Sequence, residues 1–255
     1  VPYLGVVHDR GMLEIQRGCT RGCRFCQAGM IYRPVREKHP DTLLRQAAEL
    51  IKNTGYEELS LVSLSTADYS RVRELVRSLL DSFEGMGVSV SLPSLRVDAF
   101  SVDLAREVQR VRRSTLTFAP EAGTQRLRDV INKGVTEEDL LGAAAAAFAA
   151  GWTAIKLYFM IGLPTETDED LEGIAALSRR VLARGKEMGV PPKRLKVTVS
   201  VSSFVPKSHT PFQWEPQAEM EELVRRQGYL RRRLREKGLE FRWHGAAARF
   251  LEAAL

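Results

Sequence analysis

Short segments with a strand-like pattern alternate along the chain with longer segments of helical period. Apolar residues run together or alternate with polar ones at residues 12–16, 58–65, 88–92, 114–119, 154–161 and 195–201, which predicts six strands. Helical periodicity and end signals predict helices at 41–53, 70–84, 102–111, 123–130, 136–150, 169–188 and 218–237, and a segment at 239–243 precedes a short terminal helix. Because no run of hairpins appears, the pattern indicates parallel strands joined by helical crossovers.

Six strand and helix units are fewer than the eight that close a complete (β/α)8 barrel. We therefore expect an α/β fold, an open, partial (β/α)6 TIM-like barrel with active residues at the carboxyl ends of its strands. The 255 residues fit one domain without internal repeats or low-complexity linkers. Since the sequence starts at Val1 without an initiator methionine, we interpret residues 1–255 as one core domain excised from a longer protein.

Small and polar residues follow most of the predicted strands. In a parallel sheet these positions share one edge, where together they can surround a ligand with hydrogen bonds. Each one alone is also typical of an ordinary turn, so only their joint placement indicates a binding site. The positions are Ser63, Ser65, Thr66 and Asp68 after the second strand, Pro120, Glu121 and Gly123 after the fourth, Gly162, Leu163 and Pro164 after the fifth, and Ser202, Ser203 and Phe204 after the sixth.

All three cysteines of the chain follow the first predicted strand, as Cys19, Cys23 and Cys26 in the string GCTRGCRFCQAG. Thiolate ligands favour an iron-sulfur cluster or zinc over magnesium or calcium. A metal centre that needs four ligands receives only three from this loop, which leaves one position for a ligand outside the protein. Arginines at positions 17, 21 and 24 interleave with the cysteines and offset the negative charge of thiolates.

Other interpretations of the triplet are less consistent with the sequence. A structural zinc site normally has four protein ligands, and the chain has no second cysteine pair. Buried, unreactive thiols would be scattered through the sequence, and an odd, clustered count without a secretory signal argues against disulfides. The four histidines, His8, His39, His209 and His244, are too dispersed to suggest a catalytic set.

The formal net charge of +6 is unevenly distributed. Residues 10–38 contain seven cations against two acids, and residues 217–238 contain seven against four. The first excess either receives anionic groups of a cofactor or polyanion, or balances the charge of a cluster. The second lies on an amphipathic helix and is interpreted as a solvated face. No apolar stretch is long enough to span a bilayer, so we expect a cytoplasmic protein without a membrane partner.

Several long strings resemble one group of enzymes. The CxxxCxxC loop, with Phe25 before its last cysteine, is similar to the cluster motif of the radical S-adenosylmethionine (SAM) superfamily. Within it, the chain most resembles a bacterial family of radical SAM proteins that carry a cobalamin-binding domain and whose reaction is unassigned. The strings that carry this resemblance are EIQRGCTRGCRFCQAGMIYRPVRE, ELSLVSLSTADYS, LPSLR, LTFAPEAGTQRLRDVINKG, KLYFMIGLPTETDEDL and FVPKSHTPFQW.

The resemblance implies a 4Fe-4S cluster on Cys19, Cys23 and Cys26, with SAM chelating the remaining iron. Ser63, Ser65 and Thr66 stand where the superfamily usually has a Gly-Gly-Glu stretch that binds the SAM amino group, so the chain departs from the usual motif there. The other implied cofactor contacts are Phe25 in the cluster motif, Glu121 for the ribose hydroxyls, Arg126 or Lys156 for the SAM carboxylate, Ile161, Gly162 and Leu163 for the adenine, and Phe204 as an apolar wall.

The implied reaction is reductive cleavage of SAM to methionine and a 5'-deoxyadenosyl radical, which abstracts hydrogen from an unidentified substrate. The implied partner is a reducing electron donor such as flavodoxin or ferredoxin. RNA modification and cobalamin-dependent methyl transfer in the intact protein both stay open, although the chain has no cobalamin-binding domain and no D-x-H-x-x-G string. The lack of further cysteines argues against a two-cluster methylthiotransferase arrangement. The alternative is a non-catalytic iron-sulfur or zinc protein that binds nucleic acid.

Overall fold

The computed structural model describes residues 9–92, 97, 116–243 and 245, and it divides into two compact units. Unit 1 comprises Val1–Thr20 and Tyr32–Ser114, and unit 2 comprises Arg21–Ile31 and Thr115–Leu255. The division runs through the cysteine loop, so that Cys19 belongs to unit 1 whereas Cys23 and Cys26 belong to unit 2. The helix predicted at 102–111 and the terminal helix lie outside the described residues.

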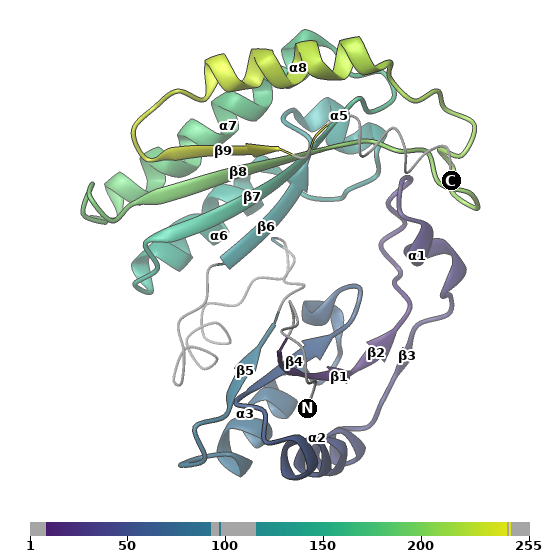
Figure 1. Cartoon of the computed structure of the whole chain (residues 1–255), viewed down its shortest axis with the longest axis vertical. Helices are drawn as coiled ribbons and strands as arrows, with labels where there is room; N and C mark the ends of the chain where they lie inside the picture. The colour runs from purple at the N-terminus through teal and green to yellow at the C-terminus, as the bar shows by residue number, and fades with distance from the viewer. Residues whose placement is uncertain (1–8, 93–96, 98–115, 244, 246–255) are drawn as a thin grey trace. The chain divides into compact units, whose positions relative to one another are not determined.

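Unit 1 contains a parallel sheet in the order β1-β4-β5, drawn in purple and blue in Figure 1. Its strands are β1 (Gly11–Glu14), β4 (Glu58–Val62) and β5 (Ser89–Ser91), its helices are α2 (Pro40–Thr54) and α3 (Val72–Ser82), and a 3-10 turn η1 (Thr66–Asp68) follows β4. A short antiparallel pair, β2 (Gln16–Arg17) with β3 (Arg36–Glu37), flanks the cysteine loop in sequence. Apolar side chains of the sheet and both helices form one buried core.

Local sequence signals set the ends of α2. Pro40 stands in the first turn, where its missing N–H costs no hydrogen bond. Gly55 ends the helix with a left-handed φ of 70°, and its N–H donates to the Ile51 carbonyl at 2.8 Å. These signals fix α2 one residue beyond the predicted range at each end.

Unit 2 contains a four-stranded parallel sheet in the order β6-β7-β8-β9. The strands are β6 (Leu116–Glu121), β7 (Ala154–Ile161), β8 (Lys196–Ser203) and β9 (Leu239–Trp243), and the helices are α1 (Gln27–Ile31), α5 (Gln125–Val130), α6 (Glu137–Ala149), α7 (Asp168–Glu187) and α8 (Met220–Arg233). Thr136 and Asp139 form a reciprocal capping box that begins α6.

The two faces of the unit 2 sheet differ in chemistry. Along β7, Ile155, Leu157 and Phe159 are fully buried, whereas Lys156 and Tyr158 on the opposite face are half-buried. Helices α6, α7 and α8 lie along one side of this sheet in Figure 1. The alternation therefore separates an apolar face under the helices from a mixed polar face.

One glycine lets the loop after β6 approach helix α7 closely. A Cβ on Gly123 would lie 2.2 Å from the backbone nitrogen of Ile174 and 2.4 Å from the carbonyl oxygen of Asp170. No other residue fits without moving one of these two segments. This approach ties the carboxyl edge of β6 to the start of α7.

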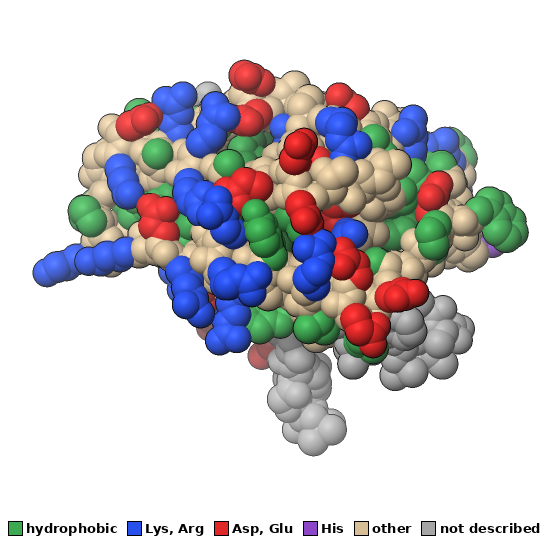
Figure 2. Space-filling view, turned by 90° about the horizontal axis from the view of Figure 1, so that it is seen from above, with side chains coloured by type: hydrophobic (Ala, Val, Ile, Leu, Met, Phe, Trp, Pro, Cys, Tyr) green, Lys and Arg blue, Asp and Glu red, His purple; other side chains and the backbone are tan. Residues whose placement is uncertain are grey.

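Charged side chains of both signs alternate over the surface seen in Figure 2. On α8, Arg225 pairs with Glu222 at 2.7 Å and with Asp168 at 2.8 Å, and Arg233 pairs with Glu172 at 2.6 Å. These arginines have carboxylate partners, which agrees with the interpretation of the 217–238 charge as a solvated, ion-paired face.

The predicted strands all appear among the described residues, with ends shifted by at most three residues, and residues 239–243 form a further parallel strand. The sequence pattern missed β2, β3, α1 and η1, which are two to five residues long. Among the described residues, no helix combines the length and the apolar character needed to cross a membrane.

Candidate cluster and cofactor site

The cysteine loop has the backbone of a segment wrapped around a bound group. Gly18 and Gly22 take left-handed φ values of 89° and 71°, and a Cβ on Gly18 would lie 2.6 Å from the Tyr32 carbonyl oxygen. The Cys26 N–H donates to the Cys23 carbonyl at 3.1 Å, and the Gly29 N–H donates to the Cys26 Sγ at 3.3 Å. Such a donor stabilises negative charge on a thiolate, so the loop fits a thiolate-ligated centre.

None of the three cysteines forms a disulfide; Cys23 is buried, and Cys19 and Cys26 are half-buried. Among the described residues, no three or more His, Cys, Asp or Glu side chains lie close enough together to hold a metal ion as they stand. The triplet itself is shared between unit 1 and unit 2. The support for an iron-sulfur or zinc centre therefore comes from the three cysteine sulfurs and from the backbone conformation of their loop.

Arg24 fastens the loop to the end of α5 within unit 2. Its guanidinium Nη1 donates to the carbonyl of Val130 at 2.6 Å, and its backbone N–H donates to the carbonyl of Ile131 at 3.0 Å. The Asn132 side chain in turn donates to the Gly22 carbonyl at 2.9 Å. A cation at a helix carboxyl end also interacts favourably with the helix dipole. The sequence string DVINKG thus serves to hold the cysteine loop.

The segment after β8 holds the other side of the same loop. Gln27 Nε2 donates to the carbonyl and hydroxyl oxygens of Ser208 at 3.2 and 3.0 Å, and the Phe212 N–H donates to the Arg24 carbonyl at 3.4 Å. These contacts give the FVPKSHTPFQW string a structural role beside Cys23 and Cys26. The sequence analysis found the string but not its partner.

An apolar cluster beneath this loop brings together three of the residues expected at the cofactor. Phe204 meets Phe212 edge to face, with ring centroids 5.9 Å apart and an angle of 89°. Leu163 is buried in the same cluster and Phe25 packs against it, so that the four residues come from three separate segments. The Phe204 N–H also donates to the carbonyl of buried Ile161 at 2.8 Å.

The end of β4 in unit 1 carries buried hydroxyls. Ser63 Oγ and Thr66 Oγ1 are 3.0 Å apart, and Thr66 Oγ1 donates to the Leu61 carbonyl at 3.3 Å. Gln16 Nε2 donates to the Ser65 carbonyl at 2.7 Å. Two buried polar atoms here, Ser65 Oγ and Gln16 Oε1, have no hydrogen-bond partner among the described residues. Burying two oxygen atoms without hydrogen bonds destabilises the folded state, unless a ligand supplies donors to them.

Glu121 ends β6 in a conformation that few side chains adopt. Its φ is 68°, and the register with β7 shifts between Phe118 and Glu121. The carboxylate pairs with Lys133 Nζ at 2.9 Å, and both side chains are largely buried, with exposed fractions of 16% and 9%. The bulge and the ion pair aim one carboxylate at the sheet edge, which is where strained residues often act.

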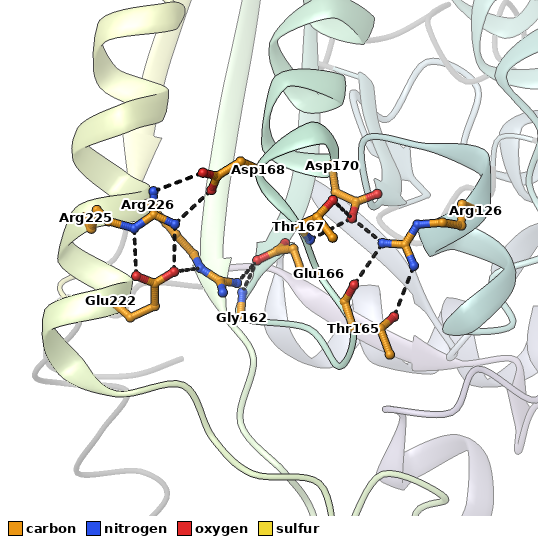
Figure 3. A network of polar contacts seen from close by, with 10 residues as sticks. All are labelled: Arg126, Gly162, Thr165, Glu166, Thr167, Asp168, Asp170, Glu222, Arg225 and Arg226. Carbon is orange, nitrogen blue, oxygen red and sulfur yellow. Dashed lines mark hydrogen bonds and ion pairs between the residues drawn. The ribbon is translucent and has the colours of Figure 1, made fainter.

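Arg126 joins α5 to the loop after β7, as Figure 3 shows. Its guanidinium donates to the Thr165 carbonyl at 2.9 Å and pairs with the carboxylate of Asp170. Burial tends to raise the pKa of Asp170, but hydrogen bonds from Thr124, Thr167 and Arg126 outweigh it and hold that pKa below its usual value. Half of the Arg126 side chain stays exposed.

Glu166 lies in the same loop and faces α8 (Figure 3). Its Oε2 accepts the Gly162 N–H at 2.7 Å and pairs with the Arg226 guanidinium, and its side chain is 1% exposed. Loss of hydration raises the pKa of Glu166 to about 7, against the opposing effect of the Gly162 and Arg226 contacts. Through this pair, α8 holds the loop after β7 at Gly162.

The family match runs from the first strand through the first half of α7. The family described as the Radical SAM superfamily matches residues 13–177. This chain belongs to the radical SAM superfamily. Radical SAM proteins are enzymes that bind a 4Fe-4S cluster and SAM, so the predicted family, enzyme class and cofactors are confirmed.

Two curated relatives cover most of this radical SAM chain. An uncharacterized protein of Methanocaldococcus jannaschii is 42% identical over 204 residues, which make up 80% of this chain and 42% of that protein. The ribosomal protein uS12 methylthiotransferase RimO of Vibrio vulnificus is 27% identical over 202 residues, covering 67% of this chain and 41% of RimO. The chain thus spans about two fifths of the length of these relatives.

A solved structure confirms the fold class. The radical S-adenosylmethionine methyltransferase TsrM from Kitasatospora setae, solved with cobalamin and a [4Fe-4S] cluster bound, matches with a TM-score of 0.62 at 13% identity. The match covers 80% of this chain and 38% of TsrM. The predicted α/β fold of the radical SAM type, a partial TIM barrel, is therefore correct.

Lys156, a predicted SAM contact, lies farther from the carboxyl edge of β7 than the predicted contacts Ile161, Gly162 and Leu163. Lys156 is the third residue of β7, five residues before Ile161. At about 3.3 Å per residue this places it roughly 16 Å along the strand from the carboxyl edge. Its Nζ donates to the Tyr158 hydroxyl at 2.7 Å.

The radical SAM core also uses residues that the sequence analysis did not single out. Gln16, Lys133 and Glu166 contact Ser65, Glu121 and Gly162, respectively. All three residues lie in the strings that carry the family resemblance, but their residue types are common and do not indicate a partner. Each contact joins residues at least four positions apart. Only the three-dimensional structure shows these partners.

Proposed function

We propose that this chain is the core of a radical SAM enzyme that carries its cluster on Cys19, Cys23 and Cys26. The observation that supports this most is a cysteine triplet without a disulfide, in a chain with no fourth cysteine, on a loop held by Arg24 and Gln27. When bound, the cluster and SAM supply one-electron cleavage of SAM to methionine and a 5'-deoxyadenosyl radical, which removes hydrogen from a substrate carbon.

The protein residues then have distinct roles toward SAM. Gln16 and Ser65 offer unpartnered buried acceptors suited to the SAM amino group, with Ser63 and Thr66 beside them in the β4 loop. Glu121 offers a carboxylate suited to ribose hydroxyls, and the exposed half of Arg126 suits the SAM carboxylate. Ile161, Gly162 and Leu163 suit the adenine, and Phe25 and Phe204 supply apolar surface.

Radical SAM enzymes need a reductant, and we propose a small electron carrier such as flavodoxin or ferredoxin for this one. The substrate proposal has two branches, RNA modification and cobalamin-dependent methyl transfer in a longer protein. The cobalamin branch has support from the likeness to TsrM and from relatives more than twice as long as the matched region. The RNA branch has support from the five excess cations in residues 10–38.

Anaerobic reconstitution with iron and sulfide, followed by dithionite and SAM, tests the proposal. We expect about four irons per chain and 5'-deoxyadenosine detected by chromatography, both lost in Cys23→Ala and kept in Lys52→Ala on α2. Stoichiometric zinc in colourless protein, or 5'-deoxyadenosine no higher than in Cys23→Ala, would instead favour the non-catalytic metal protein that binds nucleic acid.

A further inference from the structure

The polar face of the unit 2 sheet collects hydrogen-bonding side chains at one level. The register places Lys156 of β7 beside Thr117 of β6 and Thr198 of β8, and Tyr158 beside Ser200. In a parallel sheet, side chains of paired residues point to the same side. Hydroxyl groups from three strands therefore surround one lysine, on the face opposite to Leu157 and its buried neighbours.

Lys156 and Tyr158 form a compact donor pair. Lys156 Nζ donates to Tyr158 Oη at 2.7 Å and lies 4.4 Å from the centre of the same ring. Because the phenol accepts from the ammonium group, its own hydrogen is available to a third group. The ammonium group has two more hydrogens to donate. The pair thus offers three hydrogen-bond donors from adjacent atoms.

This lysine lacks the counter-charge that other charged groups of the sheet have. Glu121 pairs with Lys133 at 2.9 Å, and Glu240 pairs with Lys196 at 2.5 Å and with Arg242 at 2.7 Å. Among the residues that the structure describes, no carboxylate pairs with Lys156. A half-buried cation without an anion is costly, so an incoming anion would be stabilised there.

We propose that Lys156 and Tyr158 form a binding site for an anionic oxygen group, a carboxylate or phosphate, of the enzyme's substrate. The assignment of this anion to the substrate rests on the proposed function, whereas anion binding itself does not. Tyr158 lies three residues and roughly 10 Å before the carboxyl edge of β7, so a substrate held here extends along the sheet face toward that edge.

NMR of protein labelled with ¹³C at lysine Cε tests the site without knowing the substrate. The Tyr158 ring gives the Lys156 signal an unusual ring-current shift, and Lys156→Arg assigns that signal by its loss. The probes are inorganic phosphate and acetate, each compared with sodium chloride at equal ionic strength. Exposed Lys193 is the internal reference.

We expect saturable movement of the Lys156 signal with at least one probe, and the responding probe distinguishes phosphate from carboxylate recognition. Tyr158→Phe keeps the ring and should weaken the affinity about fivefold, because one donor is lost. Movement of Lys156 no larger than that of Lys193 with both probes overturns the proposal. If wild-type protein cleaves no SAM while anions still bind, only the proposed function is wrong.

Discussion

The guanidinium of Arg24 donates a 2.6 Å hydrogen bond to the carbonyl of Val130, the last residue of α5. The bond joins the cysteine loop to a helix 106 residues later in the chain. Arg24 stands between Cys23 and Cys26, so its position and the positions of two thiols are linked. We therefore expect cluster retention to depend on a contact outside the cysteine motif.

Replacement of Arg24 by methionine should weaken cluster retention more than it weakens the fold. The bond is exposed to solvent, so we expect the free energy of unfolding to fall by only about 1 kcal/mol. Iron bound per chain after anaerobic reconstitution and desalting should fall severalfold. Arg235→Met, on the exposed segment after α8, is the matched control. Equal iron content in both variants would contradict the role of Arg24.

Gly162 follows β7 with a φ of 78°, and a Cβ there would lie 3.1 Å from Leu223 and 3.3 Å from Ala218. Alanine at this position combines backbone strain with crowding against α8, so Gly162→Ala should lower the free energy of unfolding by about 2 kcal/mol. Chemical denaturation measures the change.

Two glycines separate these causes. Gly55→Ala has a similar φ of 70° but open space, and should show the backbone strain alone, about 1 kcal/mol. Gly142→Ala in α6 has neither problem and should stabilise by roughly 0.5–1 kcal/mol. If Gly162→Ala were no worse than Gly55→Ala, contact with α8 would be irrelevant.

The raised pKa of Glu166 leads us to expect that the folded state loses stability as the pH rises. Its folded pKa of about 7 lies above the ordinary glutamate value of 4.5, so between these values the folded state holds a proton that the unfolded state releases. The stabilising contribution is complete below pH 4.5 and is lost as the pH rises through 7, by at most ~3 kcal/mol. Urea denaturation at pH 5, 6, 7 and 8 measures this slope.

Glu166→Gln removes the titrating group, so its stability should change less over the same range. Glu172, Glu222 and Glu240 do not interfere, because hydrogen bonds from their arginine and lysine partners lower their pKa values to about 2. Their contributions are present above pH 4.5 and disappear only in more acidic solution. Identical slopes in wild type and Glu166→Gln would rule out Glu166 as the source.

The sequence was sufficient for the parallel strands because their signal repeats over many residues. The eight-residue strand β7 shows a strict alternation of buried and half-buried positions, and its predicted range equals the observed one. By contrast, β2 and β3 have two residues each and exist through pairing with one another. Periodicity cannot detect elements that short.

The candidate site divides in the same way. Spacing and the neighbouring arginines predicted a metal site at the cysteine triplet, and position after a strand selected Leu163 and Phe204, which the structure places in one apolar cluster. Position after a strand could not give the neighbours of Lys156 on adjacent strands, Thr117 and Thr198, which depend on register. Nor could it give the partner of Glu121, since Lys133 is one of many cations in the chain and only folding selects it.

Ser65→Ala tests the unit 1 part of the SAM site. The Ser65 hydroxyl is buried without a partner among the described residues, so its removal should leave the free energy of unfolding unchanged or raise it by up to ~1 kcal/mol. If that oxygen accepts a hydrogen bond from the SAM amino group, the Kd for SAM should rise about tenfold. Equilibrium dialysis of reconstituted protein with labelled SAM measures this Kd. Ser178→Ala, at a buried serine of α7 that donates to the Ile174 carbonyl at 2.7 Å, should leave the Kd unchanged. An unchanged Kd in Ser65→Ala would remove this hydroxyl from the site and leave Gln16 as the acceptor to test next.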